Sequence, residues 1–343
     1  GLADALRSQN IAAFGPSAAA ARLEGSKYFA RDFCKRYNIP QPAYERFTDT
    51  QKAKEYASII GPQSVIKADG LAAGKGVVVC GSTKQAFDTI DMMLAGGFGD
   101  ASQTILVEAC ITGPELSAFA LVDGEDVIWL ASARDHKRAF DGNKGPNTGG
   151  MGAASPSPDE TDSLREDILK NILEPTAKGM VADGAPYTGI LYAGLMLTNQ
   201  GPQVIEFNCR FGDPEAQVIL PRLKSDLLDI IISHCNQKQQ EANIVFSPDI
   251  AITVIMANKG YPGSYQANSI IRQLDTISLK SDRFIYHSGT QRNDKGDIIA
   301  SGGRVLSITA TASTYSAARK KAYDTVSLVK WENGFYRTDI GNF

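Results

Sequence analysis

Cysteine is scarce in this sequence and shows no pattern. The 343 residues include only five cysteines, and no two of them form a Cys-x-x-Cys pair. An odd, scattered set of cysteines argues against a disulfide framework and against a structural zinc site. We therefore expect buried thiols in a reducing, cytoplasmic compartment.

Long apolar runs and an excess of one charge are also missing. No apolar run approaches the roughly 20 residues that a membrane-spanning helix needs. The opening segment GLADALRSQN has neither the charged region nor the apolar region of a signal peptide. The net charge is −3, and Lys and Arg form no long runs. Neither a membrane nor a nucleic acid is therefore an expected partner.

What remains is an ordinary soluble composition, with 43% apolar and 21% charged residues. The length suggests about two or three domains. Apolar periodicity and turn residues predict a mixed α/β fold. We predict helices at 2–9, 18–37, 50–60, 82–94, 160–183, about 214–236 and 314–329. We predict strands at 11–17, 64–68, 76–80, three runs between 104 and 132, an antiparallel pair at 188–197 and 202–211, and further strands at 250–257 and 303–312.

Two stretches lack a clear periodic pattern. Residues 133–158 form the longest irregular stretch, and a compact domain rarely keeps so long a loop without a use for it. The polar segment 235–249 is the best candidate for a linker. The chain beyond that segment has the pattern of a small α/β unit.

The first candidate motif is the glycine-rich stretch VIKADGLAAGKGVVV at residues 65–79. It is one residue too short for a phosphate-binding P-loop, and it leads into a strand rather than a helix. A hairpin of this kind can fold over a triphosphate as a flap, offering backbone N–H groups and Lys75. Lys67 lies on the incoming strand as a fixed charge. Taken alone, the stretch also fits a glycine-rich hairpin with solvated lysines.

The second candidate motif is the strand VIEFN at residues 204–208. Side chains alternate along a strand, so Glu206, Asn208 and the following Arg210 share one face. Ile205, Phe207 and Cys209 are expected on the opposite, apolar face. A carboxylate and an amide oxygen two residues apart suit Mg²⁺, and an adjacent arginine suits a phosphoryl oxygen. The alternative is a polar, solvated face on an edge strand.

Four stretches together resemble one enzyme family. They are LEGSK at 23–27, KADGLAAGKGV at 67–77, DHKR…GPNTGGMGA at 135–153 and EFNCRFGDPE at 206–215. They resemble the phosphoribosylamine–glycine ligase family, also called glycinamide ribonucleotide synthetase, of the ATP-grasp superfamily. The resemblance covers almost the whole chain and includes GGRVLSITA in the C-terminal part.

The resemblance implies an ATP-grasp fold with a small lid subdomain and a C-terminal α/β domain. Residues 1–20 would be the remnant of an N-terminal Rossmann-like domain, of which about 100 residues would be missing. Residues 21–240 would form the ATP-grasp domain, with the lid at about 43–107, and residues 250–343 the C-terminal domain. The missing part would lower activity, because it normally helps to hold phosphoribosylamine. The chain would be a trimmed enzyme or one domain of a multifunctional purine enzyme.

The implied reaction is the ATP-dependent ligation of glycine to 5-phosphoribosylamine in de novo purine biosynthesis. It yields glycinamide ribonucleotide, ADP and phosphate through a glycyl phosphate intermediate. The implied cofactors are ATP and Mg²⁺, with Mn²⁺ as a possible substitute. Both substrates are small molecules.

The resemblance also assigns roles to single residues. Lys27 and Lys67 would hold ATP phosphates, Gly74 to Gly76 would form the flap, the backbone of Glu108 to Ile111 would face adenine, and Glu115 would bind the ribose. The full nucleotide set is Lys27, Lys67, Gly74, Lys75, Gly76, Glu108, Ala109, Ile111 and Glu115.

The metal and substrate roles follow in the same way. Glu206 and Asn208 would hold Mg²⁺, and Arg210 and Lys67 would stabilise the transferring phosphoryl group. The residues implied to line the glycine and phosphoribosylamine pocket are Asp135, Lys137, Asn147 and Asp213.

Some residues depart from the family or stay outside it. Ala109-Cys110 and Pro114 stand where the family often has acidic or bulky residues, but backbone contacts to adenine should persist. His136 is a candidate acid–base group, although an amine nucleophile and a phosphate leaving group need little proton help. His234 and His287 fit no motif, and we expect them to be structural or at the surface.

Two other functions remain open from the sequence. One is a different ATP-grasp carboxylate–amine ligase, against which the DHKR…GGMGA stretch argues. The other is a nucleotide-binding module without turnover. The enzyme that the resemblance implies would release phosphate from ATP only with glycine and phosphoribosylamine, whereas a binding module would bind ATP and release none.

Overall fold

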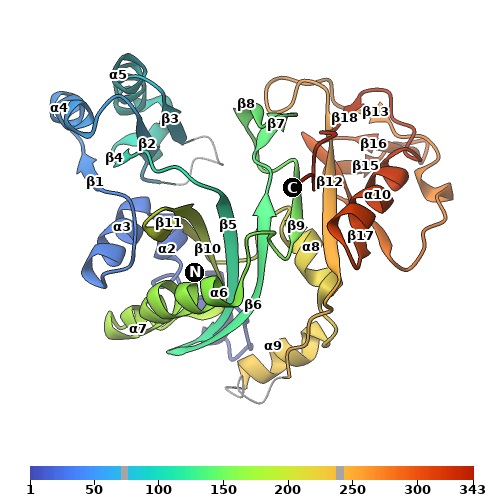
Figure 1. The fold of residues 1–343 in the computed structure, drawn as a ribbon, viewed down its shortest axis with the longest axis horizontal. Helices are drawn as coiled ribbons and strands as arrows, with labels where there is room; N and C mark the ends of the chain where they lie inside the picture. The colour runs from blue at the N-terminus through green and yellow to red at the C-terminus, as the bar shows by residue number, and fades with distance from the viewer. Residues whose placement is uncertain (71–75, 237–242) are drawn as a thin grey trace. The chain divides into compact units, whose positions relative to one another are not determined.

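The chain forms two compact units, each assembled from separate stretches of sequence (Figure 1). The structure, a computed structural model, describes residues 1–70, 76–236 and 243–343. Unit 1 takes Gly1–Leu130, Thr161–Phe211 and Ile231–Gln239, and unit 2 takes Ala131–Glu160, Gly212–Ile230 and Gln240–Phe343. Strand β6 (Asp126–Asp135) and helix α9 (Leu227–Cys235) each continue from one unit into the other along the chain.

The lid part of unit 1 is a four-stranded antiparallel sheet with two helices. Its strands lie in the order β1-β4-β2-β3. The strands are β1 (Tyr44–Phe47), β2 (Ser64–Ala68), β3 (Val77–Cys80) and β4 (Ile105–Ala109), and the helices are α4 (Thr50–Ile60) and α5 (Thr83–Met92). A π-turn η1 (Met93–Gly97) and a 3-10 turn η2 (Gly99–Ser102) lead from α5 to β4.

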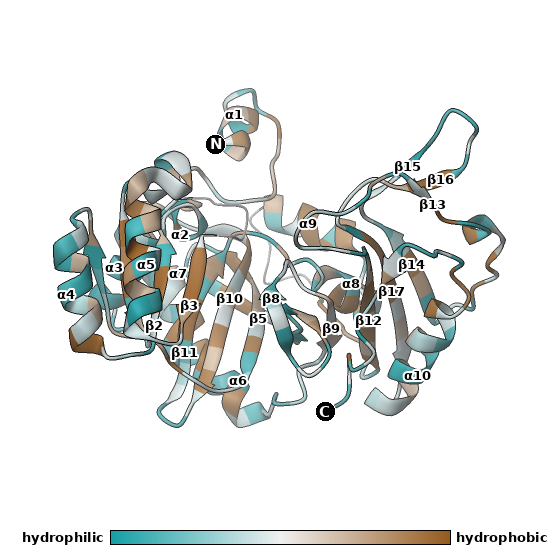
Figure 2. Cartoon of the chain, turned by 90° about the horizontal axis from the view of Figure 1, so that it is seen from above, coloured by the Kyte–Doolittle hydropathy of each residue, from teal (hydrophilic) through white to brown (hydrophobic). Residues whose placement is uncertain are grey.

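Side-chain alternation gives the lid sheet two different faces. Ile66 on β2 and Val107 on β4 are fully buried in a cluster with Ala57 of α4 and Ile90 of α5. In Figure 2 the helices α4 and α5 carry teal stretches. The residues between the apolar positions, such as Lys67, face the other way.

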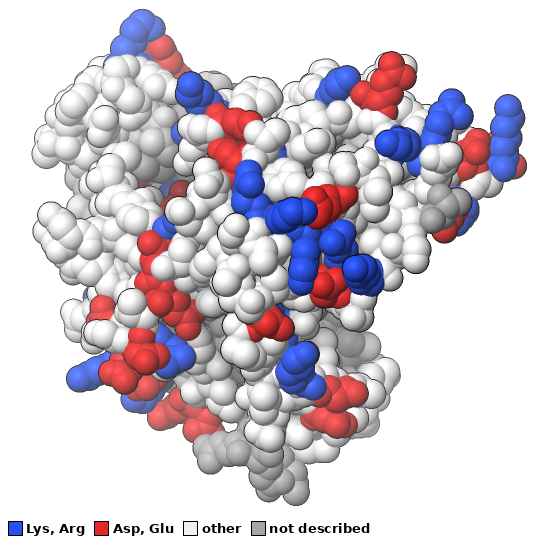
Figure 3. Space-filling view, turned by 45° about the vertical axis from the view of Figure 1, so that its right-hand side comes forward, with Lys and Arg blue, Asp and Glu red and all other residues white. Residues whose placement is uncertain are grey.

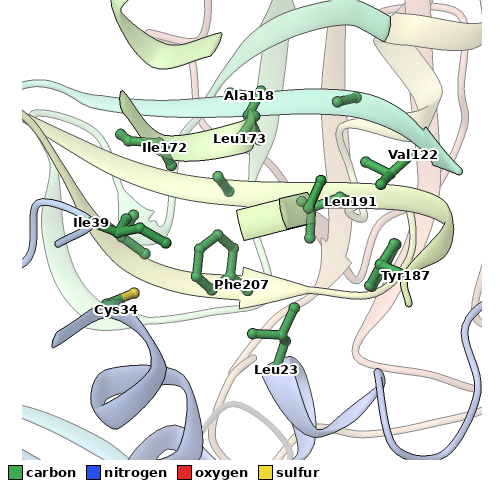
Figure 4. Close-up of a cluster of buried hydrophobic side chains, with 14 of the residues drawn as sticks. Leu23, Cys34, Ile39, Ala118, Val122, Ile172, Leu173, Tyr187, Leu191 and Phe207 are labelled. Atoms are coloured by element: carbon green, nitrogen blue, oxygen red, sulfur yellow. The ribbon is translucent and has the colours of Figure 1, made fainter. Parts of the chain in front are cut away.

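The remainder of unit 1 is a second antiparallel sheet packed against helices. Strands lie in the order β11-β10-β5, followed by β6. The elements are α1 (Leu2–Ser8), α2 (Arg22–Gly25), α3 (Lys27–Arg36), β5 (Glu115–Asp123), α6 (Asp162–Ile168), η3 (Leu169–Leu173), α7 (Glu174–Ala182), β10 (Thr188–Thr198) and β11 (Gly201–Asn208). Figure 4 shows the core between them, in which Phe207 of β11 lies among Leu23, Tyr187 and Leu191.

Unit 2 contains an antiparallel sheet in the order β9-β12-β17-β14, with the end of β6 beside β9 and β18 paired to β12. Its apolar core, which includes Ile252, Ile308 and Trp331, packs against α10. The elements are β7 (Arg138–Phe140), β8 (Lys144–Asn147), β9 (Gly152–Ser155), α8 (Ala216–Ile219), η4 (Leu220–Arg222), β12 (Ile250–Asn258), β13 (Ser269–Ile270), η6 (Leu274–Thr276), β14 (Arg283–His287), β15 (Thr290–Arg292), β16 (Ile298–Ala300), β17 (Arg304–Ala312), α10 (Tyr315–Val326) and β18 (Gly334–Phe335).

The predicted helix at 18–37 is wrong in one important detail. It is two helices, α2 and α3, separated by Ser26 in an extended conformation (φ −136°, ψ 116°). The Ser26 hydroxyl accepts a hydrogen bond from the N–H of Phe29 and donates one to Asp69. Serine is a favoured N-cap because its side chain satisfies a free N–H at the start of a helix. The break makes Lys27 the first residue of α3.

Two further predictions need correction. Residues 11–17 form no strand; the carbonyl of Gly15 accepts hydrogen bonds from the side chains of Arg7 and Thr188 instead of from a strand partner. Residues 133–158 are not one irregular stretch, because they contain the paired strands β7 and β8 as well as β9, which pairs with β12. Glycine, proline and asparagine in this stretch conceal the alternation that marks a strand.

Other expectations are confirmed. The pair β10–β11 is antiparallel as predicted, with Thr198 opposite Gly201 at the turn between the two strands. The C-terminal strands β12 and β17 and helix α10 occupy the predicted segments. All five cysteines lie in the described part of the chain and are free thiols; Cys34 and Cys80 are buried as expected, but the expected burial is wrong for the other three, which are half-buried. Among the described residues, no helix is long and apolar enough to cross a membrane.

Candidate functional site

Three charged side chains meet below the lid sheet of unit 1. Glu108 of β4 accepts two hydrogen bonds from Arg31 of α3, both of 2.8 Å. The ammonium of Lys67 on β2 lies 2.9 Å from the same carboxylate, at Glu108 Oε2. The side chains of Arg31 and Glu108 are only 3% and 2% exposed. Lys67 and Glu108 lie on the sheet face that the lid helices leave uncovered, as their alternation with Ile66 and Val107 requires.

The same cluster is joined to β11 by backbone carbonyls. Arg31 donates to the carbonyls of Val204 and Ile205, each at 2.7 Å, and Lys67 donates to the carbonyl of Ile205 at 3.1 Å. Successive carbonyls of a regular strand point to opposite sides. Here the register shifts between Gly194 and Leu195 of β10, so that Ile205 is an extra residue in β11. This bulge allows one guanidinium to reach two consecutive carbonyls.

The bulge corrects the predicted faces of β11. Val204 and Phe207 are buried in the core, at 1% and 2% exposure, whereas Ile205 is only half-buried and lies outside that core. The prediction that Ile205 packs in the core is therefore wrong, because the extra residue interrupts the two-residue period. Phe207 and Cys209 do pack on the core side as expected.

The charges of the cluster depend on one another. Burial lowers the pKa of Lys67 despite the attraction of Glu108, and repulsion from Arg31 lowers it further. Burial acts to raise the pKa of the Glu108 carboxyl, but Lys67 and Arg31 hold it below its ordinary value. With one anion between two cations, the cluster presents excess positive charge.

Lys27 adds a second ammonium close to the glycine-rich hairpin. Its Nζ donates to the carbonyl of Gly70 at 3.0 Å, and Asp69 accepts from the N–H of Tyr28 at 2.7 Å. Burial lowers the pKa of Lys27, and the negative charges of Glu206 and Asp69 act in the opposite direction. Gly70 packs closely here, since a Cβ on it would lie 2.9 Å from the Cα of Ala101.

Glu206 and Asn208 lie half-buried at the end of β11, and Glu206 packs closely against Gly194 of β10. Gly194 is the cross-strand partner of Glu206, and a Cβ on Gly194 would lie 3.1 Å from Glu206 Cγ. Carboxylate and amide oxygens suit Mg²⁺, which usually combines one or two protein ligands with phosphate oxygens and water. Across the described residues, no group of three or more His, Cys, Asp or Glu side chains could hold a metal by itself. The pair fits an ion that takes its other ligands from a nucleotide.

Arg210 lies just beyond β11 and is held by an acid from α2. Its Nη2 is 3.0 Å from Glu24 Oε1 and 3.3 Å from Asn208 Oδ1. The other oxygen of Glu24 accepts from the N–H of Cys209 at 2.7 Å. The Arg210 side chain is 57% exposed. It is therefore oriented yet accessible.

The remaining predicted nucleotide residues lie along the same two sheets. Ala109 ends β4 and its N–H donates to the carbonyl of Ala43, and Ile111 follows in the link to β5. Glu115 begins β5 opposite Met196 of β10. Gly76 is buried, and its carbonyl accepts from the N–H of Ala68 at 2.8 Å. Gly74 and Lys75 lie outside the described residues.

The predicted substrate residues all belong to unit 2. Asp135 ends β6, and a Cβ on Gly150 would lie 2.7 Å from its Oδ1 and 2.4 Å from Pro214. The carbonyl of Lys137 accepts from the N–H of Thr148 at 2.7 Å, so the two ends of the β7–β8 hairpin meet there. Asn147 is exposed on β8. Because Gly150 has no side chain, the segment GGMG at 149–152 packs closely against Asp135 and against the segment GDPE at 212–215.

Asp213 is positioned by an arginine that the sequence analysis did not single out. Arg304 of β17 donates to Asp213 Oδ2 at 2.7 Å, to the Asp213 carbonyl at 2.8 Å and to the Gly149 carbonyl at 2.6 Å. One side chain thus joins two of the loops that carry predicted substrate residues. On the face shown in Figure 3, several Lys and Arg side chains lie next to one another near the centre, with Asp and Glu beside them.

The three histidines have no catalytic geometry of their own. His136 stacks on Phe343, and burial together with Arg337 lowers its pKa to about 4, so it is neutral near pH 7. His234 is buried with its ring edge against Phe14, and His287 is exposed beside Thr290.

Sequence reasoning missed Arg31, Glu24, Arg304 and Gly194. Two of these had a usable signal: Arg31 follows Lys27 by four residues, which places both on one face of a helix, and Arg304 belongs to the GGRVLSITA stretch. Glu24 lies in LEGSK, although only its lysine was considered. Gly194 carried no signal, because its importance depends on the register of β10 against β11.

The chain matches two family models along most of its length. Residues 25–216 match "Phosphoribosylglycinamide synthetase, ATP-grasp (A) domain", and residues 251–343 match "Phosphoribosylglycinamide synthetase, C domain". A phosphoribosylamine–glycine ligase of Rhizobium meliloti is 50% identical over 341 residues, which cover 99% of this chain and 80% of the relative. The corresponding protein of Escherichia coli O6:H1 is 46% identical over 343 residues, with the same 99% and 80% coverage.

Solved structures agree with the sequence relatives. The crystal structure of phosphoribosylamine–glycine ligase from Thermotoga maritima has a TM-score of 0.84 at 33% identity, covering 95% of this chain and 81% of that one. The biotin carboxylase domain of Hydrogenobacter thermophilus 2-oxoglutarate carboxylase, solved with MgADP, has a TM-score of 0.75 at 16% identity, covering 97% of this chain and 72% of that one. This second likeness concerns the ATP-grasp fold alone. The chain therefore belongs to the phosphoribosylamine–glycine ligase family of ATP-grasp enzymes, which are ATP-dependent carbon–nitrogen ligases of purine biosynthesis.

Proposed function

We propose that this chain binds ATP in unit 1, between the lid face bearing Lys67 and the end of β11, and uses it to join glycine to 5-phosphoribosylamine. The observation that carries the proposal is the 3.1 Å contact of the Lys67 ammonium with the carbonyl of Ile205. Ile205 directly precedes Glu206. The contact joins the strand that enters the glycine-rich hairpin to the strand that carries the candidate metal ligands.

The nucleotide is held mainly by charge and by backbone groups in this proposal. Lys27 and Lys67 bind phosphate oxygens, with Lys67 drawing on the excess positive charge of its cluster. Gly74, Lys75 and Gly76 cover the phosphates and keep water from the reacting group. The backbone from Glu108 through Ala109 to Ile111 faces adenine, and Glu115 binds the ribose hydroxyls. The side chain of Glu108 does not face adenine in this proposal, because it is paired with Arg31 and Lys67.

Glu206 and Asn208 hold Mg²⁺, or Mn²⁺ in its place, beside the phosphates. The position of both residues at the end of β11 and the oxygen character of the pair support this assignment. When bound, the ion neutralises charge on the phosphate oxygens and orients them.

The chemistry asks the chain mainly to position reactants and balance charge. A carboxylate oxygen of glycine attacks the γ-phosphorus of ATP, the bond to the bridging oxygen breaks, and ADP leaves. The amine of phosphoribosylamine then attacks the carbonyl carbon of glycyl phosphate; phosphate leaves and the nitrogen loses a proton. Arg210, held by Glu24 and largely exposed, stabilises the charge that moves between oxygens.

Glycine and phosphoribosylamine are held by unit 2 residues in this proposal. Asp135, Lys137, Asn147 and Asp213 contribute, and Arg304 holds Asp213 against the segment at Gly149. His136 takes no proton-transfer role, because burial lowers its pKa to about 4 and so makes the imidazole a weak base near pH 7. We also propose a cytoplasmic location, which the five free thiols support.

The test follows oxygen from glycine to phosphate. With glycine labelled with ¹⁸O in its carboxylate, each turnover should place one ¹⁸O in the released phosphate, because the attacking oxygen leaves with phosphorus. Phosphate release should require both glycine and phosphoribosylamine. Unlabelled phosphate would exclude the acyl phosphate route. ATP binding with no phosphate release under any combination would favour a nucleotide-binding module.

A further inference from the structure

Arg31 occupies a position that the proposed reaction does not explain. It lies on α3, and its side chain is 3% exposed. Four of its hydrogen bonds reach two different parts of unit 1: two go to Glu108 in the lid sheet and two to the carbonyls of Val204 and Ile205 in β11. All four are between 2.7 and 2.8 Å. A planar guanidinium with fixed donors suits such a junction.

The partners of Arg31 are also the partners of Lys67. Lys67 bonds to Glu108 Oε2, which Arg31 also contacts, and to the carbonyl of Ile205, which Arg31 also contacts. Arg31 therefore fixes both acceptors that hold the Lys67 ammonium. Other charged groups close to this cluster are Lys27 and Glu206.

The charge balance makes Arg31 matter for Lys67 in a second way. A lysine paired alone with a buried carboxylate is neutralised, and the pair offers little attraction for a phosphate. Because Arg31 compensates Glu108 through a bidentate pair, the cluster with a protonated Lys67 carries one net positive charge. Arg31 also occupies the two carbonyls of the bulge, which would otherwise be buried without full hydrogen bonding.

We propose that Arg31 is a positioning residue for nucleotide binding: it holds Glu108 and the β11 bulge so that the Lys67 ammonium stays fixed toward the ATP phosphates. The inference rests on the proposed function, in which Lys67 binds phosphate. A purely structural Arg31 would stabilise unit 1 without any influence on nucleotide affinity.

The test compares two Arg31 variants with a buried arginine elsewhere. Arg222 is 8% exposed and bonds to Ser155 and to the carbonyl of Asp249 within unit 2, so Arg222→Met is a matched control. Calorimetry measures the Kd for MgATP, and steady-state kinetics give KM for ATP and for glycine. Arg31→Met should raise the Kd and the KM for ATP by about tenfold or more, as loss of a supporting contact does at other sites. The KM for glycine should stay the same as in the wild type.

Arg31→Lys should bind MgATP more tightly than Arg31→Met, because it keeps the charge beside Glu108. Arg222→Met should lower the melting temperature and leave the Kd for MgATP within about twofold of the wild type. The proposal fails if Arg31→Met folds, at whatever melting temperature, and binds MgATP as tightly as the wild type. Arg31 would then be only structural.

Lys67→Met separates this inference from the proposed function. If Lys67→Met also leaves MgATP affinity unchanged, the proposed nucleotide site itself is wrong. If Lys67→Met weakens binding and Arg31→Met does not, only the role of Arg31 is overturned. Should Arg31→Met fail to fold, the double variant Arg31→Met/Glu108→Leu removes both buried charges together. We expect it to fold and still bind MgATP weakly; affinity equal to the wild type would refute the proposal.

Discussion

An arginine–glutamate pair contacts the chain of β11 before its candidate metal ligands, and another contacts it after them. The two pairs differ in hydrogen-bond geometry and in burial. Arg31–Glu108 is bidentate at 2.8 Å, with side chains 3% and 2% exposed. Arg210–Glu24 spans 3.0 Å, with side chains 57% and 24% exposed. The first pair lies at the bulge before Glu206, and the second lies just after Asn208.

The difference separates two uses of arginine. A buried, fully hydrogen-bonded guanidinium cannot meet a substrate, but it can fix the groups around it. An exposed guanidinium contributes little to stability, but it can turn toward a developing charge. The predictions below test this separation, beginning with the largest expected effect.

Arg31→Met should lower the free energy of unfolding by ~3–5 kcal/mol, the usual range when one partner of a buried ion pair is removed. The variant leaves Glu108 with Lys67 alone and removes donors from the carbonyls of Val204 and Ile205. Urea unfolding at fixed pH measures the loss. A change below about 1 kcal/mol would mean that the buried pair is worth no more than an exposed one.

Glu206→Gln should reduce turnover by ~2–4 kcal/mol of barrier, or about 30- to 1000-fold, with little change in melting temperature. The substitution keeps the size of a half-buried side chain and removes the charge that attracts the cation. Raising the Mg²⁺ concentration should restore part of the activity. Glu166→Gln, an exposed residue of α6, serves as the control. If Glu206→Gln melts the protein and leaves turnover per folded molecule intact, the assignment of its face is wrong.

Val204→Ala and Ile205→Ala test the bulge between the two pairs. Val204 is 1% exposed in the core, so its truncation should cost ~1–3 kcal/mol. Ile205 is the extra, half-buried residue, and its truncation should cost less than half as much. Urea unfolding of both variants gives the comparison. A larger loss at Ile205 would contradict the bulge and would favour the regular strand that the sequence predicts.

Arg210→Ala should change the free energy of unfolding least, by ~0–1 kcal/mol, since its pair with Glu24 is exposed. Turnover should nevertheless fall, because the side chain that meets the transferring phosphoryl group is gone. Melting temperature and kcat are measured on the same preparation. Strong destabilisation with kcat retained would show that Arg210, like Arg31, serves the fold.

Much of this arrangement could be predicted from sequence where one local pattern decides the structure. The strand β2, the pair β10–β11 and the shared face of Glu206 and Asn208 follow from two-residue alternation over short segments. The family motifs named the residues of the candidate site. The C-terminal unit was predicted for the same reason, because β12, β17 and α10 have clear periods.

The rest depended on partners distant in the chain. Ser26 breaks the predicted helix by capping α3, and Asp69, 43 residues away, accepts from the same hydroxyl. The bulge at Ile205 is set by the register against β10 and by Arg31, which lies 174 residues earlier. Neither feature leaves a periodic signal in its own segment, so residue spacing alone could not show that Arg31 and Lys67 share their acceptors.

The central claim is that ATP lies between Lys67 and the end of β11, and a crystal structure with Mg²⁺ and a non-hydrolysable ATP analogue tests it most directly. The account predicts a phosphate oxygen within hydrogen-bonding distance of Lys67 Nζ, about 2.7–3.2 Å. It also predicts a metal ion about 2.1 Å from an oxygen of Glu206. Arg31 should remain bonded to Glu108 and make no contact with the nucleotide. A nucleotide bound elsewhere, or a metal ion that neither Glu206 nor Asn208 contacts, would contradict the account.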